Sequence, residues 1–179
     1  MMKLYHTSNS FYTLKEGLKA NFKHEDTKAI NKLLNKYNHG NGCFDRDHCI
    51  FLILDKRTHC VITYSIDLDA LDINKLYIAN QWFSDALYMC CECNELTDEI
   101  VKEAANKYIS SIQKFSLDKI NLYDNLELFY TGDIPSNFLT IENIDRDEFS
   151  DFINNLESKK LENEYFKILL DKHEQLTKQ

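Results

Sequence analysis

Apolar and polar residues follow one another in this chain in segments that predict both strands and helices. Residues 49–54 form a continuous apolar run, residues 60–68 alternate, and the two together predict a β-hairpin. Further strands are predicted at residues 3–5, at 122–130 and at 138–141. The pattern therefore predicts that strands and helices both occur along the chain.

Helical periodicity accounts for most of the remaining chain. Residues 11–18 predict a short helix and residues 29–37 a second one with one apolar face. The clearest helix follows Thr97, which is expected to cap it. Its apolar stripe consists of Ile100, Val101, Ala104, Ala105, Tyr108, Ile109 and Ile112. Residues 145–179 are helical in pattern and heavily charged, so they either pack on the domain or hold a partner.

The length, composition and net charge of the chain disfavour several classes of protein. The 179 residues fit one domain, and four glycines and one proline leave little room for flexible linkers. A net charge of −8 disfavours non-specific binding to nucleic acid, because the phosphate backbone attracts Lys and Arg. No apolar stretch is long enough to span a membrane, and no signal core precedes the first strand. We therefore expect a cytoplasmic protein with reduced cysteines.

Two short motifs carry candidate chemistry. The first is Leu-Tyr-His-Thr-Ser at residues 4–8, with Gly-Leu at residues 17–18 about ten residues later. The second has Glu127 inside an apolar strand, followed by Thr-Gly-Asp-Ile-Pro at residues 131–135. Taken alone, a histidine after a strand is usually a satisfied core or surface residue. A strand glutamate faces solvent about as often as it faces a site.

The order and separation of these motifs resemble the ADP-ribosyltransferase superfamily, over roughly residues 3–144. RNA 2′-phosphotransferases and DNA-targeting ADP-ribosyltransferase toxins share this layout. The resemblance implies the α+β class, with a split antiparallel β-sandwich and flanking helices over residues 1–144. It also implies a C-terminal helical extension, residues 145–179, packed on the same domain. It implies NAD-dependent transfer of ADP-ribose to an unknown macromolecular acceptor, either protein or nucleic acid. Because the motifs end by Ile144, we also expect the extension to be separable from the domain.

The same resemblance implies a set of NAD-binding residues. His6 matches the histidine that bonds the nicotinamide-side ribose, and Thr7 and Ser8 match neighbours that contact NAD. Phe51 occupies the position of an aromatic residue that stacks on nicotinamide. Families of this type commonly have tyrosine there, and phenylalanine keeps the stacking face but loses the hydroxyl. Tyr64, on the partner strand, is a substitute candidate.

Two charged residues complete the predicted site. Glu127 matches the catalytic carboxylate, which stabilises an oxocarbenium-like ribose and is expected to meet His6 across a cleft. Arg46 lies between Asp45 and Asp47 just before the buried strand. Its guanidinium group either binds a pyrophosphate or phosphate, or forms an ion pair with one of these aspartates.

A metal site is not predicted. Residues 90–93 read Cys-Cys-Glu-Cys, but adjacent cysteines on a helix point to different sides, and paired zinc knuckles are absent. Asp67, Asp69 and Asp72 lie where a strand runs into a turn, and aspartate is common there for turn geometry. NAD, acting as a substrate, is the one cofactor that the sequence implies.

Two alternatives to the transferase remain open. An RNA 2′-phosphotransferase-like enzyme would need several basic residues around His6, and the chain offers few. A non-enzymatic interaction protein would keep the fold and bind a protein partner through its acidic surface and the helices of residues 145–179. Phenylalanine at position 51 favours this second alternative.

Overall fold

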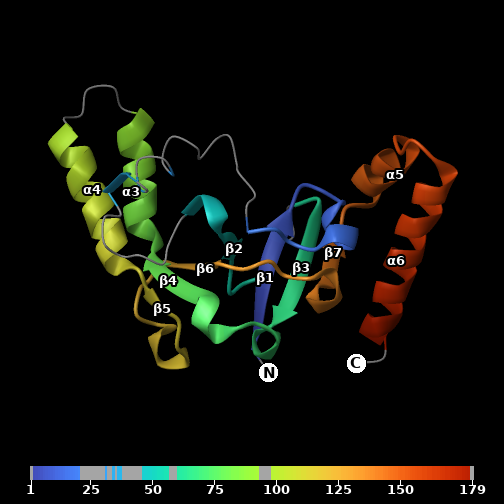
Figure 1. Cartoon of the computed structure of the whole chain (residues 1–179), viewed down its shortest axis with the longest axis horizontal. Coiled ribbons are helices and arrows are strands. Elements are labelled where there is room, and N and C mark those ends of the chain that lie inside the picture. Colours follow the sequence, from blue (N-terminus) through green and yellow to red (C-terminus); the bar gives the residue numbers. More distant parts are fainter. Residues whose placement is uncertain are drawn as a thin grey trace. The chain divides into compact units, whose positions relative to one another are not determined.

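The computed structural model describes residues 2–20, 31, 34, 36–37, 46–56, 60–92 and 98–177. The chain forms two compact units, and each is assembled from segments that are distant in sequence (Figure 1). Unit 1 comprises Met1–Leu18, Leu52–Leu71 and Asp133–Gln179. Unit 2 comprises Lys19–Phe51 and Asp72–Gly132.

Unit 1 is built on a three-stranded sheet in the order β1-β3-β7, with both pairings antiparallel. The strands are β1 (Lys3–Ser8), β3 (Ile62–Asp67) and β7 (Thr140–Ile144). Successive side chains in a strand alternate between the two faces, and directly paired residues share a face. Leu4 therefore lies on one face with its partner Ile66, and both are fully buried.

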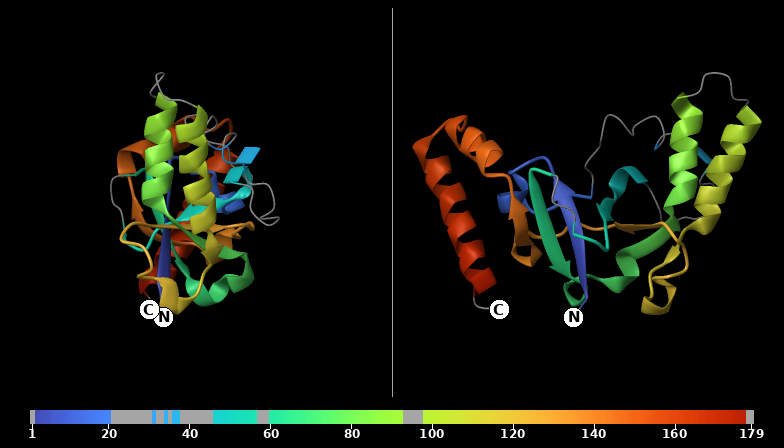
Figure 2. Two further views of the ribbon diagram at one scale, coloured as in Figure 1. Left: turned by 90° about the vertical axis from the view of Figure 1, so that its left-hand side faces the viewer. Right: turned by 180° about the vertical axis from the view of Figure 1, so that it is seen from behind.

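Three helices belong to unit 1, namely α1 (Thr13–Glu16), α5 (Arg146–Asn154) and α6 (Lys159–Thr177). Asp145 caps α5, because its carboxylate accepts the backbone N–H groups of the first helical turn. α6 contacts α1, α5 and β7 (Figure 2). Short 3-10 turns lie at Leu68–Ala70 and Ser136–Phe138.

Aromatic rings join the C-terminal helices to the first residues of unit 1. The ring of Phe11 lies 5.2 Å from those of Phe149 and Phe152, and Phe152 lies 5.0 Å from Tyr165. Phe149 and Tyr165 are buried, so α5 and α6 complete the core of this unit. This burial corrects our expectation that residues 145–179 are separable. The charged residues of α5 and α6 mark the exposed sides of these helices and give no information on their buried sides.

The glycine of the first motif docks on the turn of the second. Gly17 ends α1 with a φ of 75°, and Leu18 forms a two-way backbone bridge with Ile134. A Cβ atom on Gly17 would lie 2.3 Å from the carbonyl oxygen of Ile134. Both the backbone angle and the close approach therefore require glycine at this position.

Unit 2 contains a four-stranded sheet in the order β2-β6-β4-β5. Its strands are β2 (Ile50–Leu52), β4 (Leu76–Asn80), β5 (Gln113–Lys114) and β6 (Leu126–Tyr130). The predicted hairpin is wrong, because β2 joins β6 while β3 lies in the sheet of unit 1. Apolar runs show that two segments are buried strands. They do not identify which strands pair.

Two helices of unit 2, α3 (Gln81–Glu92) and α4 (Asp98–Ser111), run side by side (Figures 1 and 2). 3-10 turns lie at Arg46–His48, Ile73–Lys75 and Leu117–Lys119. One cluster of its buried core contains Leu34, Cys49, Tyr77, Ala79, Leu87, Ala105, Tyr108, Ile109 and Phe129. The predicted stripe of α4 thus reaches the core through its C-terminal half, whereas Ile100 is exposed.

At this level the α+β class is confirmed, since helices accompany two sheets with antiparallel pairings. Of the helix predicted at residues 29–37, only Asn31, Leu34, Lys36 and Tyr37 are described, all as helical. Its other residues and Thr97 lie outside the described residues. Within the described part of the chain, no helix has the length and apolar character needed to cross a membrane.

Candidate functional site

Glu127 points into unit 2. It pairs with Ala79 across β6 and β4, and it shares a strand face with Phe129, two residues further along. Ala79 and Phe129 both belong to the buried core of this unit. The Glu127 side chain is accordingly only 11% exposed, which rules out a solvent-facing glutamate.

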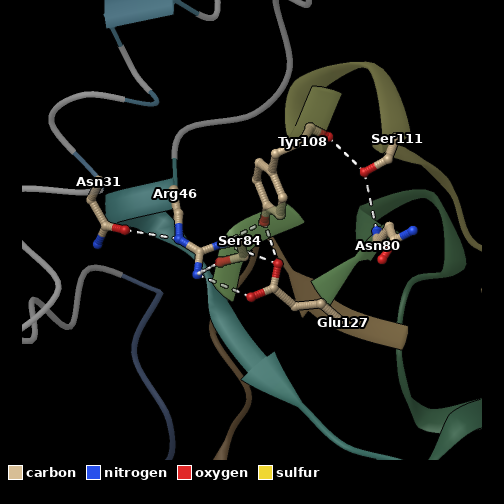
Figure 3. A network of polar contacts seen from close by, with 7 residues as sticks. All are labelled: Asn31, Arg46, Asn80, Ser84, Tyr108, Ser111 and Glu127. Carbon is tan, nitrogen blue, oxygen red and sulfur yellow. Dashed lines mark hydrogen bonds and ion pairs between the residues drawn. The ribbon is translucent and has the colours of Figure 1, made fainter. Parts of the chain in front are cut away.

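Arg46 binds this carboxylate with both arms of its guanidinium group (Figure 3). Nη1 donates to Oε2 and Nη2 donates to Oε1, each at 3.0 Å. Two parallel, charge-assisted hydrogen bonds fix the orientation of both groups. The sequence suggested either an ion pair with Asp45 or Asp47, or phosphate binding. The structure shows an ion pair with Glu127, which lies 81 positions away along the chain, and Asp45 lies outside the described residues.

The remaining donors of Arg46 are also used. Nε donates to the side-chain oxygen of Asn31 at 2.8 Å, and Nη2 donates to the hydroxyl of Ser84 at 3.3 Å. Nη1 donates to the hydroxyl of Tyr108. Since arginine has five N–H groups and each has an acceptor here, Arg46 has no donor left for a pyrophosphate in this arrangement. The phosphate-binding role of Arg46 stays a prediction, and it requires at least one of these donors to change its partner.

Tyr108 is hydrogen-bonded to both charged groups of the pair, Arg46 and Glu127. Its side chain is fully buried, and its hydroxyl donates to Oε2 of Glu127 while accepting from Arg46. Burial, reinforced by the nearby negative charge of Glu127, raises the pKa of Tyr108 well above its ordinary value. Burial acts to lower the pKa of Arg46, but Tyr108 and Glu127 outweigh it and the net pKa is raised. The phenol therefore stays neutral and the guanidinium stays charged.

Backbone contacts fix the end of α4 that carries Tyr108. The hydroxyl of Ser111 donates to the carbonyl oxygen of Tyr108 at 2.6 Å and accepts the backbone N–H of Asn80 at 3.1 Å (Figure 3). Asn80 ends β4, which is the strand paired with β6. One serine thus ties α4 to the sheet next to Glu127.

Phe51 also contacts the guanidinium group of Arg46. The central carbon of Arg46 is 4.5 Å from the centre of the Phe51 ring, within cation–π range. The ring also packs against the core of unit 2 and lies 6.3 Å from Phe129. The predicted nicotinamide-stacking residue is therefore already in contact with a cation. Whether it also stacks on a ligand stays a prediction.

The first motif lies in unit 1. His6 pairs with Tyr64, and it lies on the face of the sheet that contains the buried Leu4. His6, Thr7 and Ser8 are all partly buried. The hydroxyl of Ser8 accepts the backbone N–H of Ser10 at 3.1 Å, so it closes the turn that follows the strand.

Tyr64 is a core residue, which corrects its expected role in stacking. Its ring is fully buried and has no face available to a nicotinamide. Burial raises the pKa of its hydroxyl, which lies 2.8 Å from the hydroxyl of Thr13. Thr13 donates its single proton to the carbonyl oxygen of Ser10, so Tyr64 is the donor in this pair. Tyr64 therefore anchors the segment between β1 and α1.

The sequence-predicted residues thus separate into two groups. Glu127, Arg46 and Phe51 come together in unit 2, whereas His6, Thr7, Ser8 and Tyr64 belong to unit 1. The sequence did not identify three members of the buried network, namely Asn31, Ser84 and Tyr108. Tyr108 was placed on an apolar stripe, where its hydroxyl gave no separate signal.

Within the described residues, no group of three or more His, Cys, Asp and Glu side chains converges as a metal site would require. Asp72 instead caps a 3-10 turn by accepting the backbone N–H of Asn74, and Asp67 precedes another such turn. Cys49 and Cys60 carry thiol groups and are not joined in a disulfide. The side chains of the cysteines at residues 90–93 lie outside the described residues.

No protein-family model matches the chain, and the searches of curated proteins and of solved structures found no match either. The resemblance to ADP-ribosyltransferases therefore depends on the motifs of this sequence.

Proposed function

We propose that the protein is an NAD-dependent ADP-ribosyltransferase that transfers ADP-ribose to a macromolecular acceptor. The observation that carries the proposal is the state of Glu127. This strand glutamate is turned inward and is held in one orientation by Arg46 and Tyr108. A carboxylate that is fixed beforehand suits catalysis in which positive charge develops on the substrate, because no reorganisation is needed during the reaction.

Cleavage of NAD requires mainly a negative charge close to the ribose. The bond between nicotinamide and C1′ of the ribose breaks, and nicotinamide leaves with the bonding electrons. C1′ becomes an oxocarbenium-like centre, which a nearby carboxylate stabilises. A nucleophilic group of the acceptor then bonds to C1′ and releases its proton. In this reading, His6 and Thr7 bind the substrate and Glu127 acts in the transition state.

A non-enzymatic interaction protein is the second candidate, and a specific observation favours it. Both oxygens of Glu127 already accept hydrogen bonds, and the Arg46 donors are all engaged. A buried network in which both carboxylate oxygens and every Arg46 donor have partners also suits a purely structural role. The RNA 2′-phosphotransferase-like alternative has less support, because Arg46 has no donor for a phosphate.

Calorimetric titration with NAD, together with an assay for nicotinamide release, tests the proposal. Wild-type protein should bind NAD and release nicotinamide when the acceptor or water is present. His6→Ala should weaken binding by about 1–3 kcal/mol, because a buried hydrogen-bond partner is left unpaired. Absence of NAD binding at millimolar concentration would exclude the enzyme and leave the interaction protein.

The choice of variant at Glu127 matters. Glu127→Gln should abolish release and retain NAD binding, since the interaction removed acts mainly in the transition state. It also leaves Arg46 without its counter-charge, so circular dichroism must accompany the assay. Glu127→Asp is the matched control, because it keeps the charge and moves it back by one methylene. It should stay folded and still lose most of the turnover.

A further inference from the structure

The hydrogen bonds around Glu127 have a direction that assigns a separate task to Tyr108. A phenol hydroxyl has one proton. Since Tyr108 accepts from Arg46, that proton goes to Oε2 of Glu127. The order of donation is therefore arginine to tyrosine to glutamate, and it runs alongside the direct Arg46–Glu127 pair (Figure 3).

Counting acceptor positions shows what remains of the carboxylate. Among the described residues, Oε2 accepts from both Arg46 and Tyr108, whereas Oε1 accepts from Arg46 alone. Each carboxylate oxygen has about two acceptor positions. Oε2 is thus filled by described residues, and one position is left on Oε1.

We propose that Tyr108 is a positioning residue that fills Oε2, so that Glu127 offers one acceptor, on Oε1, to a hydroxyl group of the substrate. The effect of Tyr108 on catalysis rests on the proposed function. Its effect on the position of Glu127 rests only on the hydrogen bonds described above. Tyr108 would not touch the substrate. Its loss would leave the Arg46 pair in place but open an acceptor position on Oε2, so a substrate hydroxyl could bind either oxygen. Binding would then persist while the productive geometry became rarer.

Tyr108→Phe removes the hydroxyl and keeps the ring that fills the core. We expect kcat for nicotinamide release to fall about 10- to 100-fold while KM for NAD changes less than about twofold. The matched control is Tyr123→Phe. Tyr123 belongs to the same unit, and its hydroxyl donates to the carbonyl oxygen of Ser111 without contacting Glu127. This control should keep wild-type kcat.

Three kinetic results would overturn the proposal. The first is a kcat of Tyr108→Phe within about twofold of wild type, and the second is an equal loss in both tyrosine variants. The third is a loss that appears in KM rather than in kcat. Partial unfolding would also lower the apparent kcat at an unchanged KM, so kcat is calculated per folded molecule, with the folded fraction measured by circular dichroism.

A second measurement needs no activity. In nuclear magnetic resonance spectra of the wild-type protein, the Nη protons of Arg46 should give separate, slowly exchanging signals, because each donates to a fixed acceptor. Tyr108→Phe should speed exchange of the Nη1 signals and leave the Nε signal, which reports the bond to Asn31. Rapid exchange of all these protons in the wild type would overturn the proposal. If the wild type neither binds nor cleaves NAD, the proposed function fails, and these signals alone decide whether Tyr108 holds Glu127.

Discussion

The two units are stabilised in different ways. Unit 1 is closed by aromatic rings from both ends of the chain, with Phe11 packed against Phe149 and Phe152. Unit 2 has an apolar core too, but a buried ion pair with directional hydrogen bonds lies beside it. Apolar packing tolerates changes that conserve volume, whereas a buried charge tolerates very little. The units should therefore fail under different substitutions.

Two strand glutamates show this contrast at the level of single residues. Glu127 has one arginine, which is 8% exposed and binds it with both arms. Glu142 of unit 1 instead accepts from Ser65 at 2.7 Å and from Lys3 and Lys56, whose side chains are 36% and 40% exposed. Flexible, solvent-exposed lysines contribute little to stability and are screened by salt. A strand glutamate is thus held in a fixed orientation by a buried arginine in unit 2, whereas in unit 1 it pairs with lysines at the surface.

The largest effect should come from ending the chain after Ile144. This truncation removes the buried Phe149, Ile153 and Tyr165, and each large core side chain contributes roughly 2–5 kcal/mol. We expect unit 1 to lose cooperative unfolding, as followed by urea denaturation and circular dichroism. Leu170→Ala, at a side chain that is 64% exposed, should change stability by less than about 0.5 kcal/mol. A truncated chain with a wild-type urea midpoint would refute the role of α5 and α6.

Breaking the ion pair of unit 2 should come next. Arg46→Met leaves the carboxylate of Glu127 buried without its partner, which costs about 3–5 kcal/mol in the free energy of unfolding. Adding Glu127→Leu to Arg46→Met should restore much of this loss, because two apolar side chains then replace the pair. Urea denaturation of the two single variants and the double variant measures the coupling. Additive single effects would mean that the pair is not coupled.

A smaller loss is expected from Gly17→Ala in unit 1. The positive φ of Gly17 and the 2.3 Å approach to Ile134 should destabilise the protein by about 1–3 kcal/mol. Gly132→Ala in unit 2 is the matched control, since its added Cβ would meet mainly the side chains of Tyr130 and Lys75. Thermal unfolding should show a clearly larger loss for Gly17→Ala, and equal losses would contradict the docking of the two motifs.

The smallest effect concerns Glu142. Burial acts to raise its pKa, but hydrogen bonds from Ser65, Lys56 and Lys3 outweigh it and the net pKa is lowered. A carboxyl with a lowered pKa adds stability above its unfolded pKa of about 4.3, and that stability is lost as the pH falls through the folded pKa. Glu142→Gln should therefore cost less than about 1 kcal/mol at pH 7 and flatten the acid limb of the stability curve. High salt should reduce the difference, and a loss that is insensitive to salt and pH would contradict this account.

Local pattern was sufficient for several features of this protein. Helical spacing placed α4 and the helices of residues 145–179, because an amphipathic stripe depends only on residues three or four apart. Gly17 was correctly placed at the end of a helix, since few other residues adopt its backbone angle. The α+β class was implied by the motifs at residues 4–8 and 127–135, and the structure confirms it.

What the sequence could not supply were partners distant along the chain. The run at 49–54 was recognised as a strand, yet its pairing with β6 depends on a segment more than seventy residues away. The strand carrying Glu127 was found, but its inward orientation depends on the core around Ala79. Arg46 was expected to bind an adjacent aspartate or a phosphate, and only the fold brought it to Glu127 and Tyr108. Local sequence determines the period and the chemistry of each segment, whereas burial and charge pairing depend on which distant segments the folded chain brings together.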